Sequence, residues 1–322
     1  MRPVERLITM YLAIALDILY GDPPNRYHPV AWMGRWITWL QPRTAATGST
    51  GRRFLHGVGI LISGTLLSAF FGALLQRMAH HVPIPVRWFI LALGWKTMFS
   101  LRGLLKAAAE VHDALIRHDI VQARQRVSWH LVSRDTRDLN ASQVAAATIE
   151  SVAENLSDSF IAPLFYGVVG GLPAAFVYRY VNTADAMMGY RSPEYEWLGK
   201  APARADDALN LLPARLSALL IVAAAALTRA DARCAWHIMR RDARRTASPN
   251  AGYPMSAMAG ALRVELEKRS HYRLGTGPSP QANDIPRALQ VVRVAATLGT
   301  CLFSVILGLS WLASREGSGE EP

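Results

Sequence analysis

An uncharged apolar run of bilayer length places the strongest constraint on how this chain can fold. Residues 57–75, "GVGILISGTLLSAFFGALL", contain no charged side chain. A helix needs about 20 mainly apolar residues to cross a hydrocarbon core about 30 Å thick. Within that core the backbone polar groups must be satisfied inside the segment, which favours a helix. The run therefore predicts a membrane-spanning helix rather than a buried helix of a water-soluble domain.

Two further runs are almost as apolar. Residues 291–313 carry a single charge, Arg293, near one end, and Trp311 stands where a membrane interface is expected. Residues 211–227 are apolar except for Arg215. Together with residues 57–75, these runs predict an all-α, polytopic integral membrane protein.

Three weaker segments complete the set of candidate spans. Residues 5–20 follow a basic start without a small-residue cleavage site, which favours a retained helix over a signal peptide. Residues 88–101 are short for a bilayer. Residues 159–178 are broken by two prolines and a glycine pair, which predicts a kinked or re-entrant element, with a full crossing as the alternative. For the last two segments, a buried helix of a soluble protein is the competing interpretation.

The polar parts of the chain predict where the chemistry lies. Residues 102–157 have an amphipathic helical pattern, and residues 179–210 are rich in polar groups and loop signals. We expect one membrane-embedded catalytic domain over residues 1–313, whose amphipathic helices and long polar loops form the active site. Residues 314–322 are polar and rich in small residues, which predicts a disordered tail.

The charge balance narrows the class of partner. The formal net charge is +11, which suits nucleic acid, a membrane surface or anionic substrates. The excess of arginine in residues 229–250 places that segment on the cytoplasmic face by the positive-inside rule. Cys234 and Cys301 lie far apart, so neither a disulfide framework nor a metal cluster of cysteines is expected. The sequence contains no P-loop motif.

Three acids in helical register precede the broken apolar segment. Glu150, Glu154 and Asp158 follow one another at intervals of four, so a helix would place them on one face. Like charges at this spacing destabilise a helix unless something neutralises them. Mg²⁺ binds through a few carboxylates together with phosphate oxygens and water. The triad therefore suits a metal–phosphate site, and a solvated acidic face is the alternative.

A second polar cluster lies in residues 203–215, "ARADDALNLLPAR". Asp206, Asp207 and Asn210 share a helical stretch between Arg204 and Arg215. Carboxylates near arginines suit a metal-bridged phosphate, since the acids take the cation and the arginines take the anion. Surface ion pairs at a helix N-terminus are the alternative.

Four shorter motifs supply further candidates, each of which also has a structural interpretation. In the order given below, the first and second motifs are also typical of helix-capping turns. The third is typical of a turn before a helix of small residues that packs closely. The fourth contains a histidine in a proline-rich loop, and such a histidine is more often structural. Their candidate residues are Asn182, Asp185 and Arg191 in "YRYVNTADAMMGYR", Arg134 and Asp135 in "WHLVSRDTRDLN", Ser248 and Asn250 in "RRTASPNAGYPMSAMAGAL", and His28 in "YGDPPNRYHPVAWMG".

With these motifs in view, the chain resembles the CobD/CbiB family of cobalamin biosynthesis. The resemblance covers roughly residues 10–275, and the motifs occur in the family's order and approximate spacing. They read "LDILYGDPPNRYHPVAWMG", "LVSRDT", "ATIESVAENLSDSFIAPLFYGVVGGLPAAFVYRYVNTADAMMGYR", "ARADDALNLLPARL" and "SPNAGYPMSAMAGAL".

The resemblance implies a multi-pass inner-membrane ligase of the late corrinoid pathway, an adenosylcobinamide-phosphate synthase. Such an enzyme would join adenosylcobyric acid to aminopropanol phosphate, or a close relative, with ATP and Mg²⁺ as implied requirements. An acyl phosphate is the expected intermediate, because a carboxylate is a poor acyl donor. The implied partners are the corrinoid, the phosphorylated amino alcohol and the bilayer, with no nucleic acid. A homo-oligomer, or association with other membrane enzymes of the pathway, is a further expectation.

The candidate residues divide by role under this interpretation, with the active site facing cytoplasmic ATP. The expected catalytic residues are Glu150, Glu154, Asp185 and Asp207. The expected metal ligands are Glu150, Glu154, Asp158, Asp206 and Asn210. The expected substrate- or phosphate-binding residues are Arg134, Asp135, Asn182, Arg191, Arg204, Arg215, Ser248, Asn250 and His28.

Two other functional classes stay open at the level of sequence. Acids at membrane depth and a segment broken by proline and glycine also mark ion pathways, so a transporter or channel is one alternative. A non-catalytic membrane sensor or scaffold on the same fold is the other. The concentration of polar residues in loops and helix ends argues against a transporter, and the acid and arginine clusters argue against a scaffold.

Overall fold

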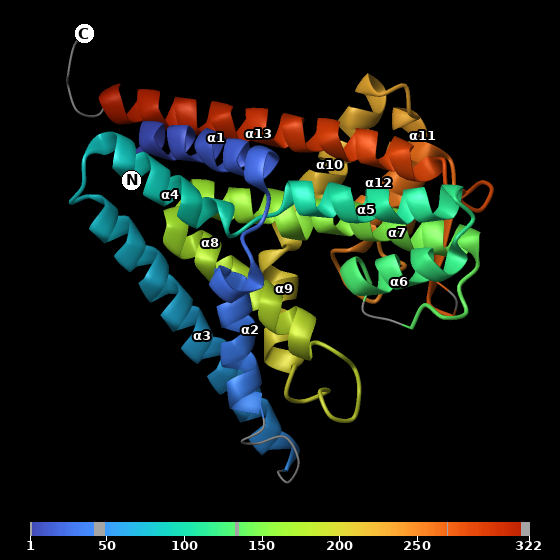
Figure 1. Cartoon of the computed structure of the whole chain (residues 1–322), viewed down its shortest axis with the longest axis horizontal. Coiled ribbons are helices and arrows are strands. Elements are labelled where there is room, and N and C mark those ends of the chain that lie inside the picture. Colours follow the sequence, from blue (N-terminus) through green and yellow to red (C-terminus); the bar gives the residue numbers. More distant parts are fainter. Residues whose placement is uncertain (1, 42–48, 133–134, 269, 317–322) are drawn as a thin grey trace. The chain divides into compact units, whose positions relative to one another are not determined.

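The computed structural model describes residues 2–41, 49–132, 135–268 and 270–316. These residues are almost entirely helical, which confirms the all-α prediction (Figure 1). A single two-stranded antiparallel hairpin accompanies the helices in the part of the chain that is described. The chain divides into two compact units, and each is described by itself. The expectation of one catalytic domain over residues 1–313 stays a prediction.

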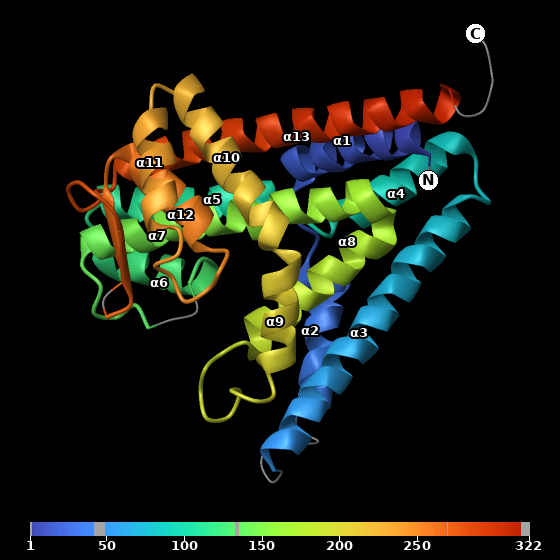
Figure 2. The ribbon, with the colours of Figure 1, turned by 180° about the vertical axis from the view of Figure 1, so that it is seen from behind.

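The first unit comprises residues 1–100, 162–209 and 302–322. Its helices are α1 (Pro3–Tyr20), α2 (Pro29–Leu40), α3 (Thr50–Ala79), α4 (Ile84–Lys96), α8 (Ala162–Met188) and α9 (Lys200–Leu209), with a 3₁₀ turn at Asn25–Tyr27. Within this unit α1 packs along α4, and α8 packs against α3 and α9 (Figure 2).

The second unit comprises residues 101–161 and 210–301. Its elements are α5 (Leu101–Ile116), α6 (Ile120–His130), α7 (Ala141–Leu156), the π-helical segment Ser157–Ile161, α10 (Leu211–Leu227), α11 (Ala232–Asp242), α12 (Gly252–Leu262), β1 (Glu265–Lys268) and β2 (Tyr272–Gly275). The last helix, α13 (Asp284–Glu316), begins in this unit and contributes its residues from 302 onward to the first.

Small side chains allow the helices of the second unit to pack closely. Every residue of α12 except Tyr253 is buried, and most side chains in its sequence "GYPMSAMAGAL" are small. A methyl group on Gly260 would lie 2.6 Å from the carbonyl oxygen of Cys234 on α11, so the two backbones meet there directly. Helices α7, α10 and α11 all pack against α12. The prediction of a smooth helix built for close packing is confirmed.

Three helical stretches are long and apolar enough to cross a membrane: Thr50–Ala79, Ala141–Met188 and Asp284–Arg315. They contain the predicted spans 57–75, 159–178 and 291–313. A fourth candidate, over the predicted span 211–227, qualifies when Lys200–Leu209 and Leu211–Leu227 are taken together. The membrane character expected from the apolar runs is therefore reproduced by helices of suitable length.

The two other predicted spans form helices that do not qualify as crossings. Helix α4 has only 13 residues and ends at Lys96, so residues 88–101 are too short as well as charged at one end. Helix α1 has 18 residues but includes Glu5, Arg6 and Asp17. Both helices instead pack against one another inside the first unit.

The expected break in residues 159–178 occurs inside α8. Gly171 has φ 69° and ψ −160°, outside the helical region, and Pro173 follows two residues later. Proline cannot donate a backbone hydrogen bond to the preceding turn, and only glycine adopts this positive φ with little strain. The kink is confirmed, while the re-entrant path stays a prediction.

The first three residues of the predicted disordered tail are helical. Residues 314–316 continue α13, because the helix extends through the polar residues after Trp311, where the Arg315 guanidinium lies 4.4 Å from the Trp311 ring centroid. The rest of the predicted tail, residues 317–322, lies outside the described residues.

Glycine permits the contact between α3 and α8. The Tyr180 hydroxyl donates to the carbonyl of Ile60 over 2.8 Å, and the Tyr180 ring is fully buried. A methyl group on Gly64 would lie 1.8 Å from the Tyr180 ring carbon Cζ. The tyrosine therefore occupies the space that any side chain at position 64 would need.

This contact predicts opposite effects for two glycines of α3. Gly64→Ala should lower the free energy of unfolding by about 1–3 kcal/mol, because the pinned Tyr180 ring must move. Gly59→Ala is the matched control: nothing lies within 4 Å of its added methyl, so the change should be neutral or stabilising by up to about 1 kcal/mol. Unfolding temperatures in detergent measure both; equal effects would contradict this account of the interface.

Candidate functional site

In the first unit, two of the predicted polar clusters meet between α8 and α9. Asn182 Nδ2 donates to Asp206 Oδ1 over 3.2 Å, and Arg179 Nη1 lies 3.4 Å from Asn182 Oδ1. Asp206 is buried. The residues come from motifs 24 positions apart in the chain, so their contact requires the packing of α9 onto α8. A buried carboxylate held by an amide can act as a metal ligand or a charge partner.

Aromatic residues form a wall beside this pair. The Tyr166 and Tyr178 rings stack with their centroids 5.1 Å apart, and the Tyr166 hydroxyl donates to the carbonyl of Leu209 over 2.8 Å. That bond fixes the end of α9 against α8. Sequence reasoning did not single out these tyrosines, because aromatic residues in an apolar run are most simply interpreted as core.

The other candidates in this unit are less enclosed. Arg204 Nη1 lies 3.9 Å from Asp207 Oδ2, and the arginine is largely exposed, so this is a weak surface ion pair. Asp185 lies near the end of α8, where its Oδ1 closely approaches Gly189. Arg191 is exposed in the turn that follows α8.

In the second unit, the three acids occupy the end of α7 and the π-helical segment that continues it. Glu150 is buried, while Glu154 and Asp158 are half-buried. Helix α7 begins at a capping box in which Asn140 and Gln143 exchange side chain-to-backbone hydrogen bonds. The cap fixes the start of α7 and so the register of all three acids.

A ladder of neutral polar side chains runs beside the acids. Asn155 Nδ2 donates to the Ser151 carbonyl over 3.0 Å, and Ser159 Oγ donates to Asn155 Oδ1 over 3.1 Å. Ser159 belongs to the π-helical segment Ser157–Ile161. Pro163 explains the wider turn, because it has no N–H to donate to the Ser159 carbonyl. Single π turns within helices often mark functional sites, and sequence periodicity did not reveal this one.

Arg215 joins two other predicted motifs in the second unit. Its Nη1 donates to Asn250 Oδ1 over 3.0 Å, and its guanidinium carbon lies 4.2 Å from the Tyr253 ring centroid. Ser248 Oγ accepts from the backbone N–H of Asn250 over 3.2 Å, which shapes the turn before α12. Asn210, also buried, lies one turn before Arg215 at the start of α10.

The proline-rich loop of the first unit has a different role from the one its histidine suggested. Lys96 Nζ lies 2.9 Å from Asp17 Oδ1 and 2.6 Å from Asp22 Oδ1, and the Lys96 and Asp17 side chains are each only 2% exposed. Ser100 Oγ donates to the other oxygen of Asp22 over 2.5 Å. These contacts fix the loop after α1 to the end of α4.

His28 takes part in the same loop as a cap. Its Nδ1 accepts from the Val30 backbone N–H over 3.2 Å, which caps α2, and its Nε2 lies 3.8 Å from Asp22 Oδ1. Burial alone would raise the pKa of Asp22, but hydrogen bonds from His28, Lys96 and Ser100 hold that pKa well below its usual range. Both His28 nitrogens thus face protein groups, which favours the structural interpretation over phosphate binding.

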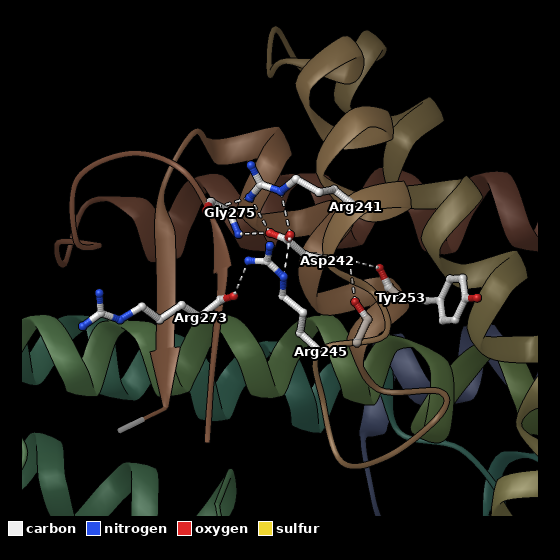
Figure 3. A network of polar contacts seen from close by, with 8 residues as sticks. Arg241, Asp242, Arg245, Tyr253, Arg273 and Gly275 are labelled. Atoms are coloured by element: carbon white, nitrogen blue, oxygen red, sulfur yellow. Dashed lines mark hydrogen bonds and ion pairs between the residues drawn. The ribbon is translucent and has the colours of Figure 1, made fainter. Parts of the chain in front are cut away.

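A fully buried carboxylate in the second unit was not foreseen from the sequence (Figure 3). Asp242 accepts from Arg241 Nη2 over 2.6 Å and from the Gly275 backbone N–H over 2.8 Å, and it lies 3.1 Å from Arg245 Nε. Burial raises the pKa of Asp242, but the bonds from Arg241 and Gly275 outweigh it and leave the pKa lowered. The network ties α11 to the β hairpin.

The remaining sequence candidates are Arg134 and Asp135. Arg134 lies outside the described residues. Asp135 is exposed and accepts from Arg137, with Nη2 to Oδ2 at 2.6 Å; the hydrogen bonds from Arg137 lower the pKa of Asp135 to about 2. An aspartate engaged in this way is a local turn partner rather than a direct phosphate ligand.

The acids do not assemble into a self-contained metal cage. Over the described ranges, no three histidine, cysteine, aspartate or glutamate side chains gather in a group that could hold a metal ion. Mg²⁺ often uses only one or two carboxylates and takes its other ligands from substrate phosphates and water. Each unit has a buried carboxylate that could join such a partial ligand set, Asp206 in the first and Glu150 in the second. The two cysteines are free, as expected.

Fold and polar clusters together define an all-α polytopic membrane protein that carries buried carboxylates and arginines next to its apolar helices. A family model described as "CobD/Cbib protein" matches residues 10–299. The chain belongs to this family.

Several relatives are similar over nearly their whole length. A "Cobalamin biosynthesis protein CobD" from Dehalococcoides mccartyi is 41% identical over 94% of this chain and 96% of its own. A "Probable cobalamin biosynthesis protein CobD" from Methanothermobacter thermautotrophicus is 41% identical over 84% of this chain and 88% of its own. A "Cobalamin biosynthesis protein CbiB" from Salmonella choleraesuis is 36% identical over 95% of this chain and 99% of its own. No solved structure matches the chain.

The buried ion cluster generates a stability prediction. Lys96→Met should lower the free energy of unfolding by about 3–5 kcal/mol, because the Asp17 carboxylate would stay buried without its cation. Adding Asp17→Asn should restore part of the loss. Lys106→Met removes a lysine that is 73% exposed and should change stability by no more than about 0.5 kcal/mol. If detergent melting gave similar values for Lys96→Met and Lys106→Met, the cluster would not stabilise the fold.

Asp242 generates a pH-dependent prediction. Folding lowers the pKa of Asp242, so its carboxylate stabilises the folded protein. This stabilisation is complete at pH values above the unfolded pKa of about 3.9. It is lost as the pH falls from there toward the folded pKa. Asp242→Asn should cost about 2 kcal/mol near pH 7, because charge-assisted hydrogen bonds are lost while both arginines still reach water. The difference in melting temperature from wild type should shrink below about pH 4. Asp113→Asn, at a 61% exposed side chain, should show neither effect.

Proposed function

We propose that this protein acts in cobalamin biosynthesis as an ATP-dependent, amide-forming ligase. It would join the free propionate carboxylate of adenosylcobyric acid to the amine of aminopropanol phosphate and release adenosylcobinamide phosphate. The observation that carries the proposal is the family match over residues 10–299, supported by relatives named for cobalamin biosynthesis that are 33–41% identical.

The chemistry explains why such an enzyme needs ATP as a co-substrate. A carboxylate does not react with an amine, so a carboxylate oxygen first attacks the γ-phosphorus of ATP, and ADP leaves. The amine nitrogen then attacks the acyl carbon, the C–O bond to phosphate breaks, and the amine loses a proton to a base. Water must be kept away from the acyl phosphate. Buried polar clusters beside apolar helices suit this requirement.

Magnesium would supply charge neutralisation for the phosphate oxygens during the transfer. The buried carboxylate that best suits such a role is Glu150 in the second unit and Asp206 in the first, where Asn182 orients it. Arg215, stacked on Tyr253 and bonded to Asn250, offers a guanidinium in a fixed orientation for an anionic substrate group. A partly enclosed carboxylate such as Glu154 would take the proton from the attacking amine.

The arginine-rich helix α11 supports a cytoplasmic orientation for its unit. Arg233, Arg240, Arg241, Arg244 and Arg245 are all exposed, and positive charge near membrane helices favours the cytoplasmic side. ATP is available on that side. We propose an inner-membrane location on the same grounds.

A reconstitution assay tests the proposal. The full-length protein, purified in detergent, should convert adenosylcobyric acid, aminopropanol phosphate, ATP and Mg²⁺ to adenosylcobinamide phosphate and ADP, as detected by mass spectrometry. Omission of ATP or of Mg²⁺ should abolish the product. Failure to form product across several detergents and lipids would remove the ligase assignment.

Substitution of the buried acids tests their roles one at a time. Asp206→Asn and Glu150→Gln should each lower turnover by about 100-fold or more, because each change removes charge while nearly preserving shape. Helix content and melting temperature should stay close to wild type. Asp113→Asn, an exposed acid of α5, should keep full activity. Wild-type rates in both buried-acid variants would exclude them from the mechanism.

A further inference from the structure

A wide concave surface lies on α6 and the turn that precedes α7, in the second unit. Its volume is about 920 Å³, near the upper end of the range of about 300–1,000 Å³ for small-molecule pockets. The polar and aromatic residues that line it are Arg124, Gln125, Ser128, Trp129, Asp135, Thr136 and Arg137. None of these residues belongs to the buried acid clusters described above.

The floor of this concave surface is fixed before any ligand arrives. Arg124 Nε donates to the Leu139 carbonyl over 2.7 Å, and Thr136 Oγ1 donates to the Arg124 carbonyl over 3.0 Å. Ser151 Oγ on α7 donates to the Leu131 carbonyl over 2.8 Å, which holds the end of α6. These three hydrogen bonds fix the end of α6 and the positions of Thr136 and Leu139, so ligand binding does not have to order those residues.

Trp129 is the unusual member of the lining. It is 84% exposed, on a helix whose mean composition is polar and whose buried residues are only Ala123 and Val127. An exposed indole offers a large, rigid apolar face, and little side-chain entropy is lost when a ligand packs on it. Aromatic residues that anchor ligands in binding sites have this property. Gln125 and Ser128, on the same side of α6, can donate and accept hydrogen bonds.

We infer that this surface binds the corrinoid substrate, with the indole of Trp129 packed against the corrin macrocycle; the inference rests on the proposed function. A corrinoid combines a broad, nearly flat apolar ring with a periphery of amide arms and one free carboxylate. The indole matches the ring, while Gln125, Ser128 and Thr136 match the amides. Arg124 brings positive charge for the carboxylate, whereas the charge of Arg137 is matched by Asp135 in the same lining.

Size separates this occupant from the nucleotide. Both ligands have a flat ring and anionic groups, so an exposed tryptophan with nearby arginines could serve either. A macrocycle with its amide arms is larger than a nucleotide, and a concavity of about 920 Å³ is large enough to suit it. The fixed floor and the wide opening favour the larger ligand.

The test measures corrinoid binding to the full-length protein in detergent, by equilibrium dialysis of cobyric acid followed by its visible absorbance. Trp129→Ala should weaken binding about tenfold, and Gln125→Ala should weaken it to a smaller extent. Trp236→Ala is the matched control, since Trp236 is a 43% exposed tryptophan on α11, and it should bind as wild type does. In the synthase assay, Trp129→Ala should raise KM for the corrinoid while kcat stays near wild type.

The outcomes separate this inference from the proposed reaction. If Trp129→Ala binds cobyric acid as tightly as wild type does, and wild type makes product, the inference is overturned and the ligase assignment stands. Weakened binding of ATP in place of the corrinoid would also overturn it and would make the surface a nucleotide site. If corrinoid binding depends on Trp129 but wild type forms no product, the inference is supported and the proposed ligase reaction is rejected. An equal loss in Trp129→Ala and Trp236→Ala would indicate a general effect of surface tryptophans and would contradict it.

Discussion

Charge withdrawn from water must be compensated, and this requirement organises both units of the protein. An isolated buried charge costs many kcal/mol, and only close partners make burial tolerable. Lys96 is held between Asp17 and Asp22, and Asp242 between Arg241, Arg245 and the Gly275 amide. In each case at least one contact joins separate elements: Lys96 of α4 meets Asp17 of α1, and Asp242 of α11 meets Gly275 of β2. The ionic contacts therefore fix tertiary structure: one holds the loop after α1, and the other holds the β hairpin.

The need to compensate buried charge also separates carboxylates that stabilise the fold from carboxylates that could take part in a reaction. Asp22 and Asp242 have several donors aimed at their oxygens, which lowers the pKa of each and uses up its capacity to accept more. One contact of Asp206 is with the amide of Asn182, a neutral donor that orients the carboxylate and does not itself cancel the charge. A carboxylate of the second kind is better suited to hold a cation or take a proton.

Local patterns predicted the helices, but they could not predict which distant residues would meet. The apolar runs without charge gave the three long spans, and the glycine pair before Pro173 gave the kink at Gly171, because these signals lie within a few residues. Lys96 was hidden inside a segment interpreted as a span, since its partners lie in a different part of the chain. Asp242 was hidden in an arginine-rich stretch that looks like a solvated surface.

The candidate sites divide in the same way. The register of the three acids followed from spacing alone, whereas the bonds of Asn182 to Asp206 and of Arg215 to Asn250 join motifs that only tertiary packing brings together. The concave surface beside Trp129 had no sequence signature, because an isolated tryptophan on a polar helix is equally compatible with a membrane interface. The roles of the individual acids depend on chemistry that no spacing encodes.

Two irregularities in the helical path near the acids follow from the backbone itself. The π-helical turn at Ser157–Ile161 precedes Pro163, and the positive φ of Gly171 precedes Pro173. Each proline removes one donor from the regular ladder, so carbonyl groups upstream must find other partners. A chain that needed only to cross the membrane would gain stability from an unbroken helix. The break at Gly171 is compensated inside the first unit, since Arg6 Nη1 donates to the carbonyls of Val168 and Val169 over 2.7 and 3.1 Å. The π-helical turn has a different consequence: it contains Asp158, so the irregular backbone sets the position of this acid relative to Glu150 and Glu154.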